Sequence, residues 1–306
     1  MALINISDML DYRYSIIIPH RDIPNLLQRC LDSIPLRKEL QIIVVDDNSS
    51  SEIVDFAHFP GNDRKEIEII YTKEGRGAGY ARNCGLEYAK GEWLLFADAD
   101  DFFLPGFLDI LDGYVHSNYD IITFRTVSVD SDTLAPVESR QSNMLDISEN
   151  MDMDKLKFRN DVPWGKMIAH RLVQEHHLRF DELPAANDAM FSAYLDYYAQ
   201  KIAASSKPIY CATVRGGSLQ YGVVLENLLT RVSVSCRYNR FLSHIGRKDK
   251  FVYSYFRVKQ CETFFGREGY YKALWIYLRM ERTGNIYKTF RDLLADKIKH
   301  LFKMQK

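Results

Sequence analysis

The feature that most constrains this chain is an alternation between short, unbroken apolar runs and longer stretches with helical apolar spacing. Residues 16–18 and 42–45 are consecutive β-branched runs, which are typical of strands buried on both faces of a parallel sheet. Between them, apolar residues recur at helical spacing as far as Ile34, and Asp22 with Pro24 marks the start of a helix. The pattern predicts one right-handed βαβ crossover.

The alternation continues along the first half of the chain. Further strands are predicted at residues 67–71, 93–96 and 121–124, and further helices at residues 78–89, 104–111 and 189–199. A polar stretch at residues 130–150 is interpreted as a loop or a lid. The sequence therefore predicts an α/β fold, in which helices flank a mostly parallel, Rossmann-like central sheet.

The character of the chain changes near residue 222, beyond which it is almost entirely helical, aromatic-rich and increasingly basic. We therefore expect a main domain at residues 1–222 and a helical C-terminal extension at residues 223–306. The last stretch, residues 286–306, has an apolar stripe with six Lys and Arg against two Asp, a local charge of +4. Such a helix can bind an anionic membrane surface, pack on the core or form a homodimer.

Composition excludes several classes of protein. Of 306 residues, 46% are hydrophobic and 26% are charged, which is ordinary for a globular protein and argues against a disordered one. A formal net charge of -1 gives no global basic field for nucleic acid. No apolar run approaches the roughly 20 residues that cross a membrane. Five scattered cysteines without a CxxC pair favour buried thiols in a reducing compartment, so we expect a cytoplasmic enzyme.

Three of the predicted strands end in polar clusters, at residues 19–22, 46–49 and 98–101. In an open parallel sheet, ligands bind in the crevice beyond the carboxyl ends of the strands. We therefore expect the three clusters to converge on one binding site.

The cluster after the fourth strand contains paired carboxylates. Asp98 and Asp100 stand two residues apart, so both can point the same way, and such a pair suits a hard divalent cation that also binds substrate phosphates. Without a cation, repulsion between the two charges is costly. The alternative is a solvated turn, with Asp101 capping the helix that begins near Pro105.

Two other segments have the chemistry of a nucleotide site. Asp47 can accept a hydrogen bond from a base or a ribose, or it can belong to an ordinary capping turn at the end of a strand. Residues 75–79 are rich in glycine but form no GxGxxG motif. Arg76 and Arg82 near a helix N-terminus favour a diphosphate, although a mobile loop with solvated arginines would have the same sequence.

Asn187 and Asp188 precede the helix predicted at residues 189–199. Either side chain can cap that helix. The other interpretation makes Asp188 a general base held at a fixed helix start that faces the cleft. Composition does not separate the two interpretations.

These segments together resemble the family 2 glycosyltransferases of the GT-A fold. The resemblance is specific at residues 15–19, 44–49, 81–85, 89–92 and 95–101, and looser at residues 164–166, 180–182, 187–188 and 215–218. It implies a nucleotide-sugar-binding half at residues 12–115 and an acceptor-side half at residues 116–222. It also implies an inverting, metal-dependent transferase of bacterial surface polysaccharide synthesis. The donor would be a nucleotide-diphospho-sugar, with UDP-sugars favoured, and the acceptor a saccharide or a lipid-linked saccharide.

The resemblance also implies roles for individual donor-side residues. Asp47 contacts the base, near Pro19 and Arg21, and Arg21 occupies a position where family members often have a stacking tyrosine. Asp98 lies near the ribose and the metal, and Asp100 binds the metal, which would be Mn²⁺ or Mg²⁺. Arg76 and Arg82 remain candidates for the diphosphate.

On the acceptor side, the resemblance assigns the catalytic base to Asp188 alone, because Asn187 replaces the first carboxylate of the family's usual pair. Arg215 and Ser218 match a loop that closes over the phosphates. Trp164 and Lys166 are candidates for the acceptor pocket. The alternative for them is a buried Trp beside a Lys that extends its ammonium group into solvent.

Two other functions remain open at this point. A sugar nucleotidyltransferase also uses an α/β sheet and paired aspartates, but it would need a glycine-rich basic loop directly after the first strand. This chain has His20, Arg21 and Asp22 there. A glycosyltransferase-like binding module without catalysis is the third hypothesis, and the presence of Asp98, Asp100 and Asp188 argues against it.

Overall fold

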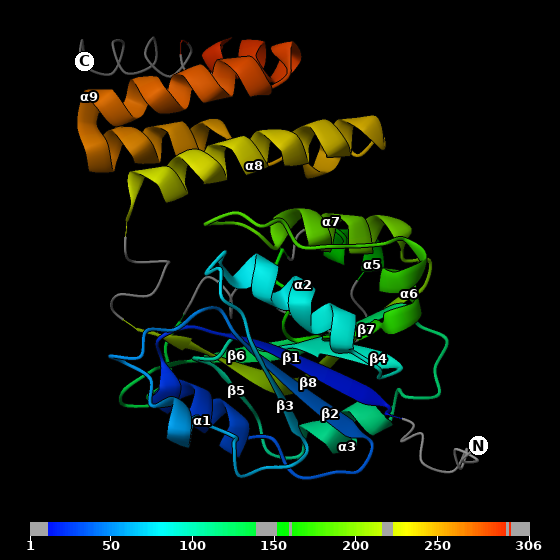
Figure 1. Cartoon of the computed structure of the whole chain (residues 1–306). Helices are drawn as coiled ribbons and strands as arrows, with labels where there is room; N and C mark the ends of the chain where they lie inside the picture. The colour runs from blue at the N-terminus through cyan, green and yellow to red at the C-terminus, as the bar shows by residue number, and fades with distance from the viewer. Residues whose placement is uncertain (1–11, 139–151, 159–160, 216–222, 292–293, 295–306) are drawn as a thin grey trace, which may run out of the picture. The chain divides into compact units, whose positions relative to one another are not determined.

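The computed structural model describes residues 12–138, 152–158, 161–215, 223–291 and 294, and it forms two compact units (Figure 1). The first unit comprises Met1–Leu183 and Asn187–Ser218, and the second comprises Pro184–Ala186 and Leu219–Lys306. The domain boundary placed near residue 222 stays a prediction.

The first unit is built on one eight-stranded sheet with the order β3-β2-β1-β4-β7-β6-β8-β5. The strands are β1 (Tyr14–His20), β2 (Leu40–Asp46), β3 (Ile67–Tyr71), β4 (Trp93–Phe96), β5 (Phe102–Phe103), β6 (Ile121–Asp130), β7 (Lys166–Ala169) and β8 (Ile202–Val214). Strands β1 to β4 run parallel to one another, and β6 runs parallel to β8. Strand β7 is antiparallel to both of its neighbours, β4 and β6. Strand β5 is antiparallel to β8. The predicted α/β fold with a mostly parallel sheet is confirmed.

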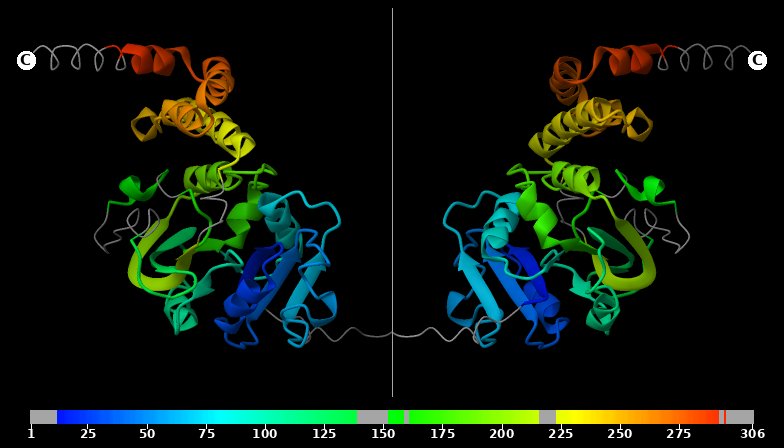
Figure 2. Two further views of the ribbon diagram at one scale, coloured as in Figure 1. Left: turned by 90° about the vertical axis from the view of Figure 1, so that its left-hand side faces the viewer. Right: turned by 90° about the vertical axis from the view of Figure 1, so that its right-hand side faces the viewer.

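Helices cover both faces of this sheet (Figures 1 and 2). They are α1 (Pro24–Asp32), α2 (Ala78–Tyr88), α3 (Phe107–Asp112), α5 (Met153–Leu156), α6 (His170–Glu175) and α7 (Ala189–Tyr198), with a 3₁₀ turn at Phe56–His58. Helices α1 and α3 pack on one face, and α2, α6 and α7 pack on the other. This double cover explains why the strands have unbroken apolar sequences.

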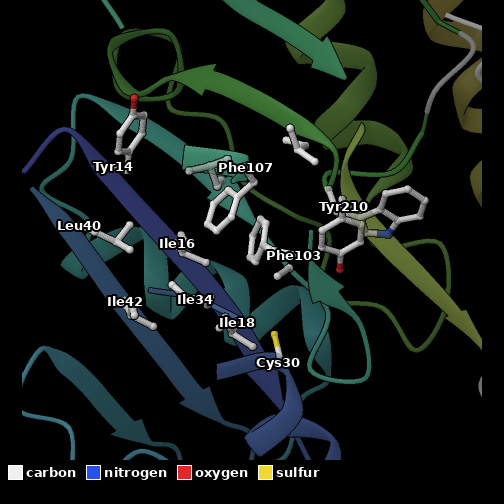
Figure 3. Packing of buried hydrophobic residues seen from close by; sticks show 14 of the residues in the cluster. Tyr14, Ile16, Ile18, Cys30, Ile34, Leu40, Ile42, Phe103, Phe107 and Tyr210 are labelled. Atoms are coloured by element: carbon white, nitrogen blue, oxygen red, sulfur yellow. The ribbon is translucent and has the colours of Figure 1, made fainter. Parts of the chain in front are cut away.

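Strand β1 shows how the two faces divide the core. Ile16 and Ile18 point to the side of α1 and α3, and Ile17 points to the side of α2 and α7. All seven residues of β1 are buried, and full burial of one such side chain stabilises the fold by about 1.5–3 kcal/mol. Figure 3 shows the apolar cluster on the side of α1 and α3, in which Phe103 and Tyr210 lie beside the isoleucines of β1.

The structure differs from the sequence prediction at two places in this unit. Strand β6 runs to Asp130, well beyond the apolar run at residues 121–124, because it pairs along its length with β8. Helix α1 begins at Pro24 as predicted, but Asp22 does not cap it. Asp22 has a positive φ of 56°, and its carboxylate accepts a hydrogen bond from the backbone amide of Ser50 at 2.7 Å.

The second unit consists, in its described part, of helices α8 (Leu225–His244) and α9 (Tyr255–Met280) with a 3₁₀ turn at Lys248–Lys250. Helix α9 bends sharply at Gly266, which has a φ of 61° (Figure 1). Val232 and Cys236 of α8 pack against Val258 and Tyr277 of α9, and these contacts form a separate apolar core. None of the helices described here is both long and apolar enough to pass through a bilayer.

Candidate functional site

The loops after β1 and β2 are joined by buried hydrogen bonds at the carboxyl edge of the sheet. His20 Nδ1 lies 2.8 Å from Asp46 Oδ1, and Ser49 donates to the same carboxylate from its hydroxyl at 2.6 Å and from its amide at 3.0 Å. Burial raises the pKa of Asp46, but the hydrogen bonds from His20 and Ser49 outweigh it and hold that pKa below its usual value. Asp46 therefore fixes the shape of this edge.

Asp47 anchors the loop that precedes α2. Its carboxylate is almost fully buried and accepts hydrogen bonds from the backbone amides of Arg76 at 3.0 Å and Gly77 at 2.6 Å. Arg21 Nη1 approaches the same carboxylate to 3.8 Å. The structure therefore brings together three of the predicted donor-side residues, and the base contact assigned to Asp47 stays a prediction.

A cavity of about 310 Å³ opens beside this edge. It is lined by Asp46, Asn48, Ser49, Phe56, Tyr71 and Thr72. The rings of Phe56 and Tyr71 lie 5.7 Å apart, edge to face, and both are partly exposed. Sequence reasoning missed these two aromatic residues, because Phe56 lies in an irregular segment and Tyr71 reads as an ordinary strand residue.

The turn after β4 gathers three carboxylates. Asp98, Asp100 and Asp101 each offer an oxygen atom, and these oxygens lie within 4.8 Å of one another. Burial raises the pKa of Asp100, with a further increase from the charge of Asp98 and a decrease from Arg215. Clustered, partly desolvated carboxylates of this kind are the oxygen donors that Mg²⁺ and Mn²⁺ take, so the residues fit a hard divalent cation.

Asp101 does not cap a helix, so the capping interpretation is wrong for this residue. Helix α3 begins only after Gly106, whereas Asp101 accepts hydrogen bonds from the Tyr210 hydroxyl at 2.9 Å and the Thr213 amide at 2.6 Å. Both partners belong to β8. Burial raises the pKa of Asp101 well above its usual value.

Tyr210 and Arg29 shape the acidic turn from outside it. The Tyr210 hydroxyl also accepts a hydrogen bond from the Asp98 amide at 2.9 Å, and Arg29 of α1 donates to the Asp100 carbonyl oxygen at 2.7 Å. Sequence reasoning missed both residues, since they lie far from the turn in the chain and match no motif.

Arg82 joins three parts of the site. One Nη donates to Asp98 Oδ1 at 2.5 Å and the other to Asn187 Oδ1 at 2.9 Å, while the guanidinium lies 5.3 Å from the centre of the Phe180 ring. Only 5% of Arg82 is exposed, so the solvated interpretation is wrong for it. Arg76 differs, because its half-exposed side chain pairs with Glu182.

A glycine lets α2 approach closely enough for this contact. A Cβ atom on Gly79 would lie 2.0 Å from the carbonyl oxygen of Asp181 and 3.0 Å from the Asn187 Cβ. No side chain fits there. Gly79 therefore serves the close packing of α2 against residues 181–187, while Gly75 and Gly77 have positive φ values in the loop before α2.

Asp188 occupies the N-cap position of α7, but its side chain makes no capping hydrogen bond. The capping interpretation is therefore wrong for Asp188. Burial raises its pKa to about 7, with a further increase from Asp161 and a decrease from Arg82. The charge of Asp98 contributes as well, which places Asp188 in the electrostatic environment of the acidic turn. A carboxyl group with a pKa near neutrality suits a general base.

Lys166 and Trp164 are both buried. Lys166 is 3% exposed, so the interpretation with a solvated ammonium group is wrong. Burial lowers the pKa of Lys166, and Asp196, Asp161 and Asp188 partly offset that decrease. Trp164 stacks on Tyr210 with ring centres 5.3 Å apart. An acceptor role for either residue stays a prediction.

Arg215 lies beside the acidic turn, and the phosphate contact that the resemblance implies for it stays a prediction. Its Nε is 3.4 Å from Asp100 Oδ2. Pro19 is buried in β1, opposite Val45 of β2. Ser218 lies outside the described residues, as does most of the stretch at residues 130–150 that was interpreted as a loop or a lid.

Comparisons with known proteins agree on one family. The model of the family described as "Glycosyl transferase family 2" matches residues 15–176. The "Putative glycosyltransferase EpsH" of Bacillus subtilis is 24% identical over 192 residues, which are 60% of this chain and 56% of that protein. The "Poly(ribitol-phosphate) beta-glucosyltransferase" of Bacillus spizizenii is 25% identical over 209 residues, 66% of this chain and 32% of the relative. The chain thus spans 56% of the first of these relatives and 32% of the second.

Solved structures share the fold. Residues 1–349 of S. aureus TarS, in complex with UDP-GlcNAc, have a TM-score of 0.71 at 19% identity, covering 89% of this chain and 82% of that one. The mannosyltransferase PcManGT of Pyrobaculum calidifontis, in complex with GDP-Man and Mn²⁺, has a TM-score of 0.50 at 13% identity, covering 94% and 81%. The GT-A fold predicted from the sequence is confirmed.

Proposed function

This chain belongs to glycosyl transferase family 2, and on that premise we propose that it transfers a sugar from a nucleotide-diphospho-sugar to a hydroxyl group. The observation that carries the proposal is the link made by Arg82. It binds Asp98 of the acidic turn and Asn187, the neighbour of Asp188. A metal-binding turn and a general base with a pKa of about 7 therefore share one environment.

We propose a UDP-sugar as the donor, supported by the UDP-GlcNAc complex of TarS. Pro19, Arg21 and Asp47 would bind the nucleotide base at the edge where β1 and β2 end, with the aromatic cavity nearby. Arg76, Arg82 and Arg215 would bind the diphosphate, since guanidinium groups form charge-assisted hydrogen bonds with phosphate.

Asp100 and Asp98 would hold Mn²⁺ or Mg²⁺, and the bound ion would neutralise charge on the leaving diphosphate. Asp101 would keep the turn in shape through Tyr210 and Thr213, without binding the ion. The Mn²⁺ complex of PcManGT supports a metal in this fold, and the choice of ion is part of the proposal.

The transfer itself would be a single displacement. Asp188 accepts the proton of the acceptor hydroxyl as its oxygen bonds to the anomeric carbon. The bond from that carbon to the diphosphate oxygen breaks, and the leaving group keeps the electron pair, so the anomeric centre is inverted. Because only the ionised carboxylate accepts a proton, a pKa of about 7 keeps Asp188 competent at neutral pH.

We propose that the acceptor is a saccharide or a lipid-linked saccharide in the assembly of a bacterial surface polymer. Support comes from the relative named as a poly(ribitol-phosphate) beta-glucosyltransferase. A cytoplasmic location at the inner face of the membrane would suit such an acceptor, and residues 286–306 remain a proposed membrane contact or homodimer contact. Trp164 and Lys166 remain candidates near the acceptor, and Ser218 near the phosphates.

The two other functions are less well supported. A nucleotidyltransferase would need a basic phosphate loop after β1, but His20 there is buried and bonded to Asp46. A binding module without catalysis would not need a carboxyl group with a pKa of about 7 beside the acidic turn.

The test is release of nucleoside diphosphate from a panel of nucleotide sugars with Mn²⁺. We expect metal-dependent release by the wild type, loss of donor binding in Asp100→Ala, and donor binding without transfer in Asp188→Ala. Asp63→Ala, an exposed carboxylate away from the site, is the matched control and should behave as the wild type. Diphosphate release from a nucleoside triphosphate would support the nucleotidyltransferase instead, and the absence of both binding and turnover would support the binding module.

A further inference from the structure

The charge of this chain is divided unequally between its two units. Residues 219–306 contain 18 Lys and Arg against 7 Asp and Glu, a formal charge of +11. Since the whole chain carries -1, residues 1–218 carry -12. A near-neutral total thus conceals a strongly cationic second unit, which attracts anionic partners.

One face of α9 carries an apolar row that nothing in the described second unit covers. Tyr271, Trp275 and Leu278 recur at intervals of four and three residues, and 63%, 61% and 45% of their surfaces are exposed. The opposite face of the same helix, with Ala273 and Tyr277, is buried against the rest of the unit. Packing within the described part of the unit therefore does not account for the exposed row.

Cations flank this row. Arg267, Lys272 and Arg279 are exposed beside it, and the Arg279 guanidinium lies 5.0 Å from the centre of the Trp275 ring. Glu268 pairs with Lys272 at 2.6 Å, so Arg267 and Arg279 supply the net positive charge beside the row. Aromatic rings with adjacent arginine and lysine are the side chains that settle at the level of lipid headgroups.

We infer that this surface, the α9 face made of Tyr271, Trp275, Leu278 and their flanking cations, binds the surface of an anionic lipid bilayer. Charge complementarity selects the partner. A second copy of the chain would bring two units of +11 together, which opposes a dimer through this face. A soluble anionic polymer would satisfy the cations but would leave the apolar row in water.

The inference concerns residues outside the proposed transferase site, and it would tether the chain to the surface of a membrane. Basic residues near an anionic leaflet and buried aromatic side chains each add to such peripheral binding, which weakens as salt rises.

Trp275 provides a direct measurement. The other two tryptophans, Trp93 and Trp164, are only 3% and 4% exposed. A shift of tryptophan emission on vesicle binding therefore comes from Trp275. The full chain is mixed, without any nucleotide sugar, with vesicles of phosphatidylcholine or of phosphatidylcholine and phosphatidylglycerol. We expect co-sedimentation and a blue shift of tryptophan emission with the phosphatidylglycerol vesicles, and loss of both at high salt.

Variants assign the binding to the α9 face. Trp275→Ala should abolish the blue shift and weaken binding at least fivefold, and Arg279→Gln should weaken binding by a smaller factor. Tyr88→Ala, which removes a ring that is 50% exposed in the first unit, is the matched control and should bind as the wild type. Unchanged emission of the buried tryptophans would show that Trp275→Ala is folded.

Several results would overturn the inference. One is that the chain binds neutral vesicles as well as anionic ones. Another is that Trp275→Ala binds anionic vesicles as the wild type does. The third is that tryptophan emission shifts to the blue with a soluble anionic polymer but not with vesicles. Since no donor is present, a failure of the proposed transferase activity would leave this measurement unaffected.

Discussion

The two proposed sides of the candidate site each hold a carboxylate, and these two carboxylates are stabilised in opposite ways. On the proposed donor side, Asp46 is buried together with its hydrogen-bond partners His20 and Ser49, and its pKa is lowered. On the proposed acceptor side, Asp188 is half-buried and makes no capping hydrogen bond, and its pKa rises to about 7. Satisfied carboxylates hold a loop in place, whereas a poorly compensated carboxyl group remains able to exchange a proton at neutral pH.

Two further charged side chains, Lys166 and Asp196, extend this contrast to the surroundings of Asp188. Lys166 and Asp196 are both buried, and each moves the pKa of the other back toward its usual value. The acceptor side therefore contains charges that are expensive to separate. The structure predicts that substitutions there act on stability and proton affinity, whereas substitutions around the acidic turn also act on its geometry.

The largest effect is expected for Lys166→Met. The change removes the buried cation that lowers the pKa of buried Asp196, and removing one partner from a buried pair of opposite charges costs about 3–5 kcal/mol of unfolding free energy. Chemical denaturation measures it, with Lys201→Met, an exposed lysine in the same unit, as the control. If Lys166→Met lost no more unfolding free energy than the control, the charges near Asp188 would be screened. That result would contradict the difference proposed between the two sides.

A smaller effect is expected for Tyr210→Phe. The change removes the hydroxyl that donates to Asp101 and accepts from the Asp98 amide, and unsatisfied buried partners cost about 1–3 kcal/mol. We also expect weaker Mn²⁺ binding, because the acidic turn loses its support from β8.

Denaturation and a metal titration test this prediction together. Tyr114→Phe, in the same unit, is the control and should stay within about 0.5 kcal/mol of the wild type. Unchanged metal affinity in Tyr210→Phe would show that β8 does not shape the donor side.

The smallest effect is expected for Arg82→Lys. Lysine keeps the charge but cannot reach Asp98 and Asn187 at once, so we expect about a tenfold loss in kcat/KM for the donor. Steady-state kinetics measure it, with Arg179→Lys, whose side chain is 45% exposed, as the control. If both variants kept wild-type kinetics, the bridge between the two sides would have no catalytic role.

The sequence predicted the strands at the proposed donor side closely, and the reason is physical. The strands at residues 67–71 and 93–96 were predicted with the bounds that the structure shows, because a parallel sheet buried on both faces leaves an uninterrupted apolar run. The polar clusters follow such strands directly, so their convergence at one edge could be inferred from topology alone.

The features that could not be predicted from the sequence depend on contacts between residues far apart in the chain. Tyr210 meets Asp101 across more than a hundred residues, and no local pattern marks either as a partner of the other. The burial of Lys166 follows from the elements that pack around β7, whereas the sequence alone left an ammonium group in solvent as an equal alternative. The prediction that Asp22 and Asp101 cap helices was also wrong, because their carboxylates accept hydrogen bonds from the backbone amides of Ser50 and Thr213 instead.

The pH dependence of transfer tests the central claim most directly. We predict that kcat, measured from about pH 5 to about pH 9 with saturating donor and metal, rises with pH and levels off above about 7, because the active form of Asp188 is the carboxylate. Asp188→Asn should be slower by about 10²–10⁴-fold and should lose this rise. A wild-type profile that is flat over this range, or an Asp188→Asn enzyme with the same rise, would contradict the assignment of Asp188 as the general base.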